Sequence, residues 1–269
     1  MAENAAEEEI RMGAQCCFER IEKKYPLTPE QYEQIKAGMK NYVKADRYSN
    51  YTISNLYYDT DDYDLIRTSL EKPVYKEKLR MRAYGTPGDQ DQVFIELKKK
   101  YEGVVYKRRI ILDADTAARY IHHGERPENL GQIGREIDYF MSSYQPSAKV
   151  MIAYDREAWQ GLDNPDLRVT FDTNLRWRDD HLDLRAGDHG LPILPPEQKQ
   201  ILMELKIPGA APLWLARLLS ETGAFSSSFS KYGAWYQNII LKQSGQTIRH
   251  DINIHHINSA ARRDFALIA

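Results

Sequence analysis

Residues 74–112 read VYKEKLRMRAYGTPGDQDQVFIELKKKYEGVVYKRRIIL. Because successive side chains of a β-strand point to opposite faces, a period of two collects the polar residues of this stretch on one face. Those residues are Lys76, Lys78, Arg80, Arg82, Glu96, Lys98, Lys100, Lys107 and Arg109. The residues between them are largely apolar. A half-buried strand usually mixes the signs of its charges on the solvent side, so three consecutive cationic segments predict a surface that binds a polyanion.

Turn-rich residues at 85–91 and 101–103 predict that the three segments form an antiparallel meander. The same alternation predicts further strands at 16–25, 51–58, 149–159, 167–172 and 201–207. Capping residues and helical patterns predict helices at 28–44, 63–70, 115–124, 126–144, 212–221 and at the end of 225–241. These strands add cations to the same face, namely Lys24, Arg156, Arg168 and Lys206. Arg176 and Arg178 have the same parity as Arg168, beyond an expected turn.

The whole chain carries 37 Lys and Arg against 39 Asp and Glu, for a net charge of −2 over 269 residues. Any anion site is therefore a local concentration of charge. The two cysteines, Cys16 and Cys17, are adjacent, which favours reduced packing thiols over a disulfide or a metal site. With no long apolar run and an acidic N-terminus, we expect a cytoplasmic protein without a membrane segment. We expect an acidic lead-in at 1–14, one domain at 15–243 and a tail at 244–269.

Two architectures can place so many cations on one face. An open sheet would leave that face solvated, where it could cover nucleic acid. A closed barrel would enclose a polar lumen, with helices on its apolar outside. A water-filled lumen suits a chain of phosphates, because arginine forks and lysine ammonium groups both bind phosphate oxygens.

Carboxylates among these cations are candidates for a divalent cation that is shared with phosphate oxygens. Glu204 is the first candidate and Glu96 the second; each could instead form salt bridges inside the basic lumen. The chain has no GxxxxGK[ST] loop, no GxGxxG and no evident nucleophile–base pair. Phosphoryl transfer remains open, since it can proceed by positioning and electrostatic stabilisation alone.

The ordered series YKEKLRMRAYG, FIELKKK, KRR, AYDREAW, LRVTFD, MELK and SFSKYG resembles the catalytic domain of the vacuolar transporter chaperone (VTC) family of polyphosphate polymerases. That family belongs to the triphosphate tunnel metalloenzymes, and the resemblance covers roughly residues 15–242. It implies an α+β fold with an antiparallel β-barrel tunnel, a basic lumen and flanking helices. It also implies that the γ-phosphate of ATP is moved to a growing inorganic polyphosphate chain with Mn²⁺ or Mg²⁺, releasing ADP, and that nucleic acid is not a partner.

The matching motifs imply roles for individual residues. The catalytic set would be Lys24, Arg80, Arg82, Lys98 and Arg156; Lys24 would meet the substrate or acceptor phosphate. Phosphate would also be bound by Lys78, Lys107, Arg109, Tyr154, Arg168, Lys206, Ser230 and Lys231. The metal would be held by Glu204, Glu96 and Glu22. Ser230 could instead only cap a helix.

Two departures from the family pattern bear on function. Ser228 stands where eukaryotic members usually have a basic residue. Hydrolytic members of the superfamily begin with an ExExK strand, whereas this chain has Arg20 in the first acidic position, which favours the polymerase. A metal-dependent triphosphatase and a non-catalytic module that binds polyphosphate or RNA are the alternatives. Tyr84, Tyr101 and Trp177 are equally open as contacts to the adenine.

Overall fold

The three cationic segments fold as consecutive strands, β3 (Tyr75–Tyr84), β4 (Gln92–Tyr101) and β5 (Val104–Asp113). They pair antiparallel in the order β3–β4–β5, so the predicted meander is confirmed. The computed structural model describes residues 20–195 and 200–243. The predicted lead-in, the cysteine pair and the predicted tail lie outside these ranges.

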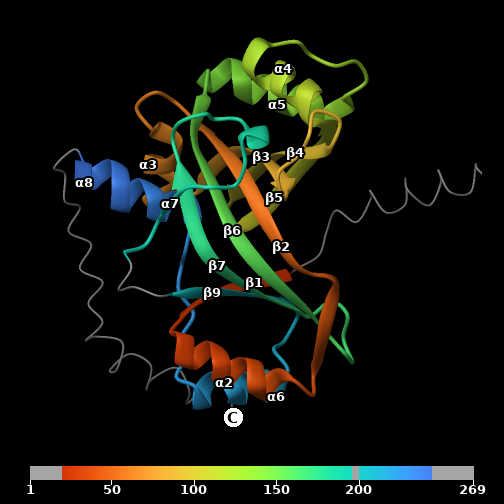
Figure 1. Cartoon of the computed structure of the whole chain (residues 1–269), viewed down its shortest axis with the longest axis vertical. Coiled ribbons are helices and arrows are strands. Elements are labelled where there is room, and N and C mark those ends of the chain that lie inside the picture. The colour runs from red at the N-terminus through yellow and green to blue at the C-terminus, as the bar shows by residue number, and fades with distance from the viewer. Residues whose placement is uncertain (1–19, 196–199, 244–269) are drawn as a thin grey trace, which may run out of the picture.

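The other strands of the described chain join the same antiparallel sheet. They are β1 (Arg20–Leu27), β2 (Val43–Asp59), β6 (Ser147–Gly161), β7 (Arg168–Arg178), β8 (Leu191–Pro192) and β9 (Ile201–Pro208). The strand order is β1-β9-β7-β6-β2-β3-β4-β5, with β8 on β7. Figure 1 shows β2, β6 and β7 running lengthwise while β1 and β9 cross below them. Within the described residues no ladder joins β5 to β1, so the sheet is a curled half-barrel.

Helices cover the convex face of this sheet (Figure 1). At one end α4 (Ala114–His123) and α5 (Gly131–Tyr144) bury Leu79 and Ile95 beneath Ile137. At the other end α2 (Pro29–Met39) and α6 (Leu213–Glu221) pack on the apolar side of β1 and β9. Thr28 and Gln31 form a capping box at the start of α2, which ends at Met39, short of the expected residue 44.

Two short helical segments, from different parts of the chain, pack on the concave side instead. Helix α3 (Asp64–Leu70) and helix α7 (Lys231–Trp235), which continues as a π-helical turn (Tyr236–Ile240) and α8 (Leu241–Gln243), lie over β2, β6 and β7. The buried carboxylate of Asp59 accepts hydrogen bonds from the backbone of Leu65 and Ile66 and from the Tyr232 hydroxyl, at 2.8–3.0 Å. Asp59 therefore stabilises the N-terminal turn of α3 and also fixes the position of α7.

A β-bulge in β7 changes which side chains face the concave side. Ala153 pairs with Arg176 but Asp155 pairs with Thr173, so β7 has one extra residue there, and Asn174 has a φ of 50°. Beyond the bulge the two faces of β7 are exchanged. Arg176 binds Asp155 on the convex side, while Trp177 packs on the concave side against α7. The expectation that Arg176 and Arg178 share the cationic face is therefore wrong, and the expected turn before them is a bulge.

Candidate functional site

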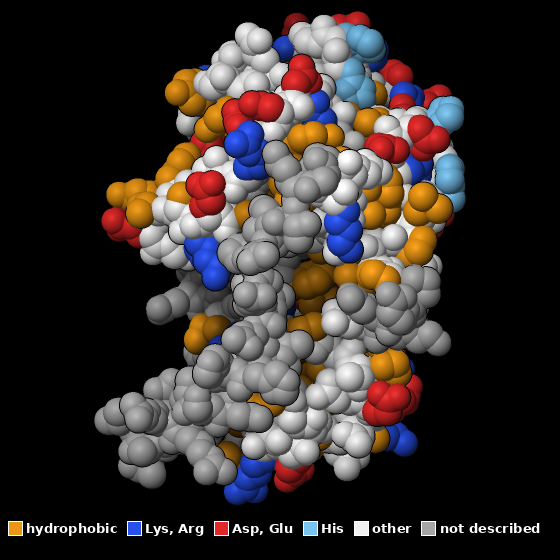
Figure 2. All heavy atoms as spheres, turned by 90° about the vertical axis from the view of Figure 1, so that its left-hand side faces the viewer, with side chains coloured by type: hydrophobic (Ala, Val, Ile, Leu, Met, Phe, Trp, Pro, Cys, Tyr) orange, Lys and Arg blue, Asp and Glu red, His pale blue; other side chains and the backbone are white. Residues whose placement is uncertain are grey.

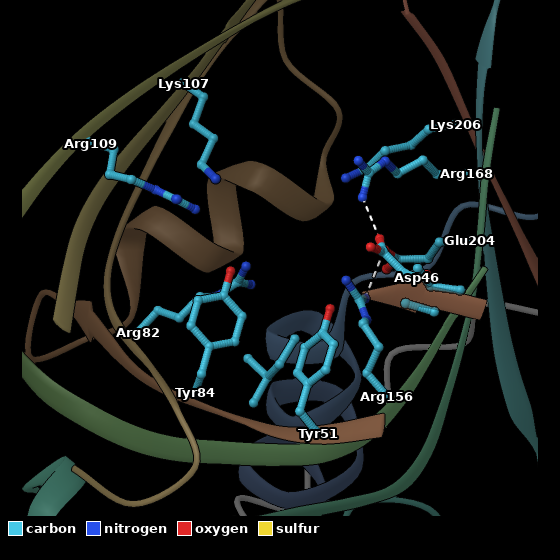
Figure 3. Close-up of a pocket in the computed structure, with 13 residues that line it drawn as sticks. Asp46, Tyr51, Arg82, Tyr84, Lys107, Arg109, Arg156, Arg168, Glu204 and Lys206 are labelled. Atoms are coloured by element: carbon cyan, nitrogen blue, oxygen red, sulfur yellow. Dashed lines mark hydrogen bonds and ion pairs between the residues drawn. The ribbon is translucent and has the colours of Figure 1, made fainter. Parts of the chain in front are cut away.

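The concave face encloses a cavity of about 200 Å³ that is lined mainly by charged side chains. Figure 3 shows Lys107 and Arg109 on one side, Arg168 and Lys206 on the other, and Arg82 between them with its head toward the cavity. Arg156, Glu204 and Asp46 complete the charged lining. On one outer face, by contrast, acidic and basic side chains are mixed (Figure 2). The positive charge is thus concentrated within the curl of the sheet, where a polyanion would be surrounded by it.

Glu96 anchors the cations of one wall. It is only 2% exposed. One carboxylate oxygen accepts from the Arg80 guanidinium at 2.7 and 2.8 Å, and the other from Lys107 at 2.7 Å and from Arg109. Burial alone would raise the pKa of Glu96, but the neighbouring charges, chiefly Arg80, hold it well below its usual range. Both oxygens of Glu96 thus form salt bridges, as the second alternative for this residue expected, and its metal role stays a prediction.

A second carboxylate pair, Asp172 and Glu204, anchors the opposite wall. Arg156 binds Asp172 with two parallel hydrogen bonds of 2.6 and 2.7 Å and reaches Glu204 at 3.1 Å. Lys231, at the first position of α7, contacts both carboxylates and lies 4.2 Å from the ring centroid of Tyr154. Burial opposes the charge of Lys231, but Asp172 and Glu204 raise its pKa above the ordinary value. Lys231 is therefore a buried ammonium group whose charge the two carboxylates stabilise.

Lysines gather at the end of the concave face that lies next to Ser230 and the start of α7, called the lysine end below. Lys24 donates to the carbonyl oxygen of Phe229 at 3.0 Å, and Lys78 donates to the hydroxyl of Ser230 at 3.4 Å. Ser230 also caps α7 by accepting from the backbone of Gly233 at 3.1 Å, and its contact with phosphate stays a prediction. Burial and the charges of nearby lysines, Lys76 first, lower the pKa of Lys78 to about 7.

This lysine end opens beside a second cavity of about 370 Å³, lined by Glu22, Lys23, Lys24 and residues 226–229. Lys98 faces the same region, and its pKa is lowered by burial and by the charges of Lys24 and Arg80. Bound phosphate would relieve this repulsion.

The structure therefore brings the predicted residues onto one concave surface. The first cavity is lined by Arg82, Lys107, Arg109, Arg156, Arg168, Lys206 and Glu204. Three more predicted residues lie beside this cavity. Tyr154 bonds to Arg82 and Lys231 to Glu204, while Arg80 binds Glu96, which also holds Lys107 and Arg109. Lys24, Lys78, Lys98, Ser230 and Glu22 form the lysine end.

Sequence reasoning missed two polar residues of the site. Asp46 pairs with Arg168 at the cavity, but it lies in the part of β2 that we expected to be helix end or loop. Asn55 is completely buried and accepts from Arg82 Nε at 2.9 Å. The amide of Asn55 in the run YTISNLYY, on the same face as Tyr51 and Tyr57, was an available signal.

A divalent cation would need ligands from both protein and substrate here. Within residues 20–195 and 200–243, no group of three or more His, Cys, Asp or Glu side chains is placed to hold a metal. Glu204 and Glu22 lie on neighbouring strands and both contact the ammonium of Lys24, at 3.6 and 3.8 Å. Two carboxylates completed by phosphate oxygens form a ligand set that suits Mg²⁺, so Glu204 and Glu22 fit a metal that arrives with a phosphorylated ligand.

None of the described helices is both long and apolar enough to span a bilayer. A curled antiparallel half-barrel with helices on its outside and cations within defines the chain as a triphosphate tunnel fold. The "putative adenylate cyclase" of Bacillus halodurans has this fold; it matches with a TM-score of 0.50 and 13% identity, over 78% of this chain and 93% of that chain. A VTC domain model matches residues 19–240, and the chain therefore belongs to the VTC domain family. The resemblance seen in the sequence motifs is confirmed.

Among characterised relatives, the chain is similar to the vacuolar transporter chaperone complex subunit 4 of Schizosaccharomyces pombe. The two are 24% identical over 208 residues, which is 66% of this chain and 29% of the fission-yeast protein. This chain thus corresponds to less than a third of that relative. The "putative adenylyl cyclase" HpAC1 from Hippeastrum matches with a TM-score of 0.48 and 15% identity over 84% of this chain and 96% of that one; this similarity supports no conclusion on activity.

Proposed function

We propose that this protein is a polyphosphate polymerase that transfers the γ-phosphoryl group of ATP to a growing inorganic polyphosphate chain and releases ADP. One observation carries the proposal: cations from five strands, β3, β5, β6, β7 and β9, and from α7 converge on a concave site that also holds the carboxylate of Glu204. Membership in the VTC domain family and the similarity to a VTC complex subunit support it.

The arginines would bind the triphosphate. Arg80 and Arg82 approach from β3 and Arg109 from β5, and each presents a planar guanidinium that can bind two phosphate oxygens. Their orientation is already fixed, because Glu96 holds Arg80 and Arg109 while Asn55 holds Arg82. Fixed donors need little reorganisation when the ligand binds, so binding energy is available for the reaction.

The reaction needs no protein nucleophile, because a polyphosphate oxygen can attack the γ-phosphorus directly. Arg156 and Lys231 would stabilise the charge that develops on the transferred group, since Asp172 holds both of them beside the cavity. Lys24 and Lys98, at the lysine end, would orient the acceptor phosphate. A bound Mn²⁺ or Mg²⁺, held by Glu204 and Glu22, would neutralise phosphate charge.

Incubation of the purified protein with ATP and Mn²⁺, followed by a denaturing gel, tests the proposal. A ladder of phosphate chains with stoichiometric ADP is the expected result. Free phosphate without a ladder would instead identify a hydrolase, and intact ATP with tight polyphosphate or RNA binding would identify a binding module. Glu204→Gln should abolish turnover; an unchanged rate would remove the metal role of Glu204.

Two neighbouring arginines of β5 provide a matched control. Arg109 faces the cavity and Arg108 faces the convex side, where it pairs with Glu136, and their side chains are 33% and 36% exposed. Arg109→Ala should weaken binding of inorganic tripolyphosphate by about tenfold or more, the loss of one charge-assisted contact. Arg108→Ala should leave that affinity unchanged. Equal losses in both variants would place the anion elsewhere.

A further inference from the structure

Aromatic side chains occupy the end of the concave face that lies opposite the lysine end. Tyr84 is the last residue of β3, on the same face as Arg80 and Arg82. Its ring packs edge-to-face with Tyr51 and with Phe94, both at a centroid distance of 5.5 Å. Tyr51 and Tyr84 both line the first cavity, and Figure 3 shows them side by side with their hydroxyls toward it.

Tyr84 remains open although its neighbours hold it in place. It is 49% exposed, so about half of its surface is available to a ligand. The arginines adjoin it directly: Arg82 lies beside it along β3, and the Arg109 guanidinium lies 4.5 Å from the ring centroid of Phe94. An aromatic surface therefore lies next to the guanidinium groups. A nucleoside triphosphate could place its base on the aromatic surface and its phosphates on the guanidinium groups.

The other aromatic candidates do not meet these conditions. Trp177 is only 7% exposed, because the bulge in β7 turns it into the core beneath Trp235. Tyr101 is as exposed as Tyr84, at 49%, but it lies at the opposite end of the β3–β4 hairpin and contacts Tyr75 rather than the cavity. Tyr84 alone of the three lines the cavity.

We propose that Tyr84, held by Tyr51 and Phe94, is the stacking platform for the nucleobase of the substrate. This inference rests on the proposed function, because it requires that a triphosphate occupies the arginines. Stacking on a tyrosine ring accepts any base, since every base has a π-face. The platform therefore selects a nucleoside triphosphate over inorganic triphosphate, with little preference among bases.

The platform also assigns a direction to the tunnel. With the base on Tyr84, the triphosphate extends past Arg82 and Arg80 toward Lys78 and Lys98. The γ-phosphate then points to the lysine end, and the polyphosphate acceptor enters from the second cavity, beside Lys24.

Binding of ATP and of inorganic tripolyphosphate, each titrated calorimetrically into the full chain with Mg²⁺, tests the platform. Tyr84→Ala should weaken ATP binding by about 5- to 150-fold, the usual loss of one base-stacking contact, and leave tripolyphosphate binding unchanged. Tyr84→Phe, which keeps the ring, should retain ATP affinity. Tyr101→Ala, which removes an equally exposed tyrosine, should change neither ligand.

The outcomes separate the two proposals. If Tyr84→Ala leaves ATP binding unchanged, or weakens both ligands equally, the platform is refuted while the triphosphate site stands. If the wild-type protein binds neither ligand, the proposed function fails and the platform fails with it.

Discussion

Lys78 gives the anion site a pH dependence that can be calculated. Its pKa is about 7 in the unliganded protein, because burial and the like charges of Lys76, Lys98 and Lys24 oppose protonation, and the charge of Asp59 only partly offsets them. Bound phosphate adds negative charge beside the ammonium group and should return the pKa toward its ordinary 10.5. Between these two values the complex binds more protons than the free protein does.

Affinity must therefore fall as the pH rises through this window. With a free pKa of about 7 and a bound pKa near the ordinary value, Lys78 alone should weaken ATP binding about 20-fold between pH 7.5 and pH 9. The ligand contributes little in this range, because a terminal phosphate has its second pKa at about 6.

Calorimetry in two buffers of different ionisation enthalpy measures the expected proton uptake directly. Lys78→Arg is the matched variant, since a guanidinium keeps its charge throughout this range. Its affinity ratio between pH 7.5 and pH 9 should be smaller than that of the wild type by about 20-fold. Equal ratios in the two proteins would refute the reasoning, because Lys78 would then be charged before the anion binds or would not contact it.

Three further predictions concern the anchors and the ends of the site. Glu96→Gln leaves Arg80 and its neighbours without a counter-charge, so thermal unfolding should show a loss of about 3 kcal/mol; tripolyphosphate should raise the Tm of this variant more than that of the wild type, and an equal rise would argue against the anchor. Asn174→Val forces a branched side chain into the left-handed region and should destabilise the protein by about 1–2 kcal/mol relative to Asn174→Gly, which loses the same hydrogen bond to Asp155; equal stabilities would contradict a strained bulge. Ser228 is exposed in the second cavity, so the Ser228→Lys variant should bind long-chain polyphosphate more tightly than the wild type, and Ser228→Asp should bind it more weakly. A matching change in ATP affinity would contradict the direction assigned to the tunnel.

The sequence predicted the meander of β3, β4 and β5 because two physical signals coincided there. Alternation placed Arg80 and Arg82 on one face, and the glycine-containing turns at 85–91 and 101–103 set the strand ends. The same alternation predicted that Lys24 and Glu204, far apart in sequence, face one region. Their direct contact required the pairing of β1 with β9, which depends on long-range packing.

What the sequence could not predict depends on departures from regular strands. The extra residue at Asn174 carries no local signal, because asparagine is also common in ordinary turns. Arg176 and Arg178 were therefore assigned to the wrong face. Similarly, the irregular register between Ala45 and Asn50 in β2 obscured the strand that carries Asp46.

The carboxylates that anchor the two walls have a consequence for movement through the site. Glu96 on one wall and Asp172 with Glu204 on the other already serve as counter-ions for the surrounding cations. A phosphate chain in the cavity would therefore compete with these carboxylates for the cations. Its binding free energy at each position would be smaller than the number of arginines and lysines suggests. If the protein extends polyphosphate as proposed, such internal competition would keep the chain from being trapped at any single position. The polymer could then advance by one unit after each addition, since each cation it leaves behind is neutralised again by its own carboxylate.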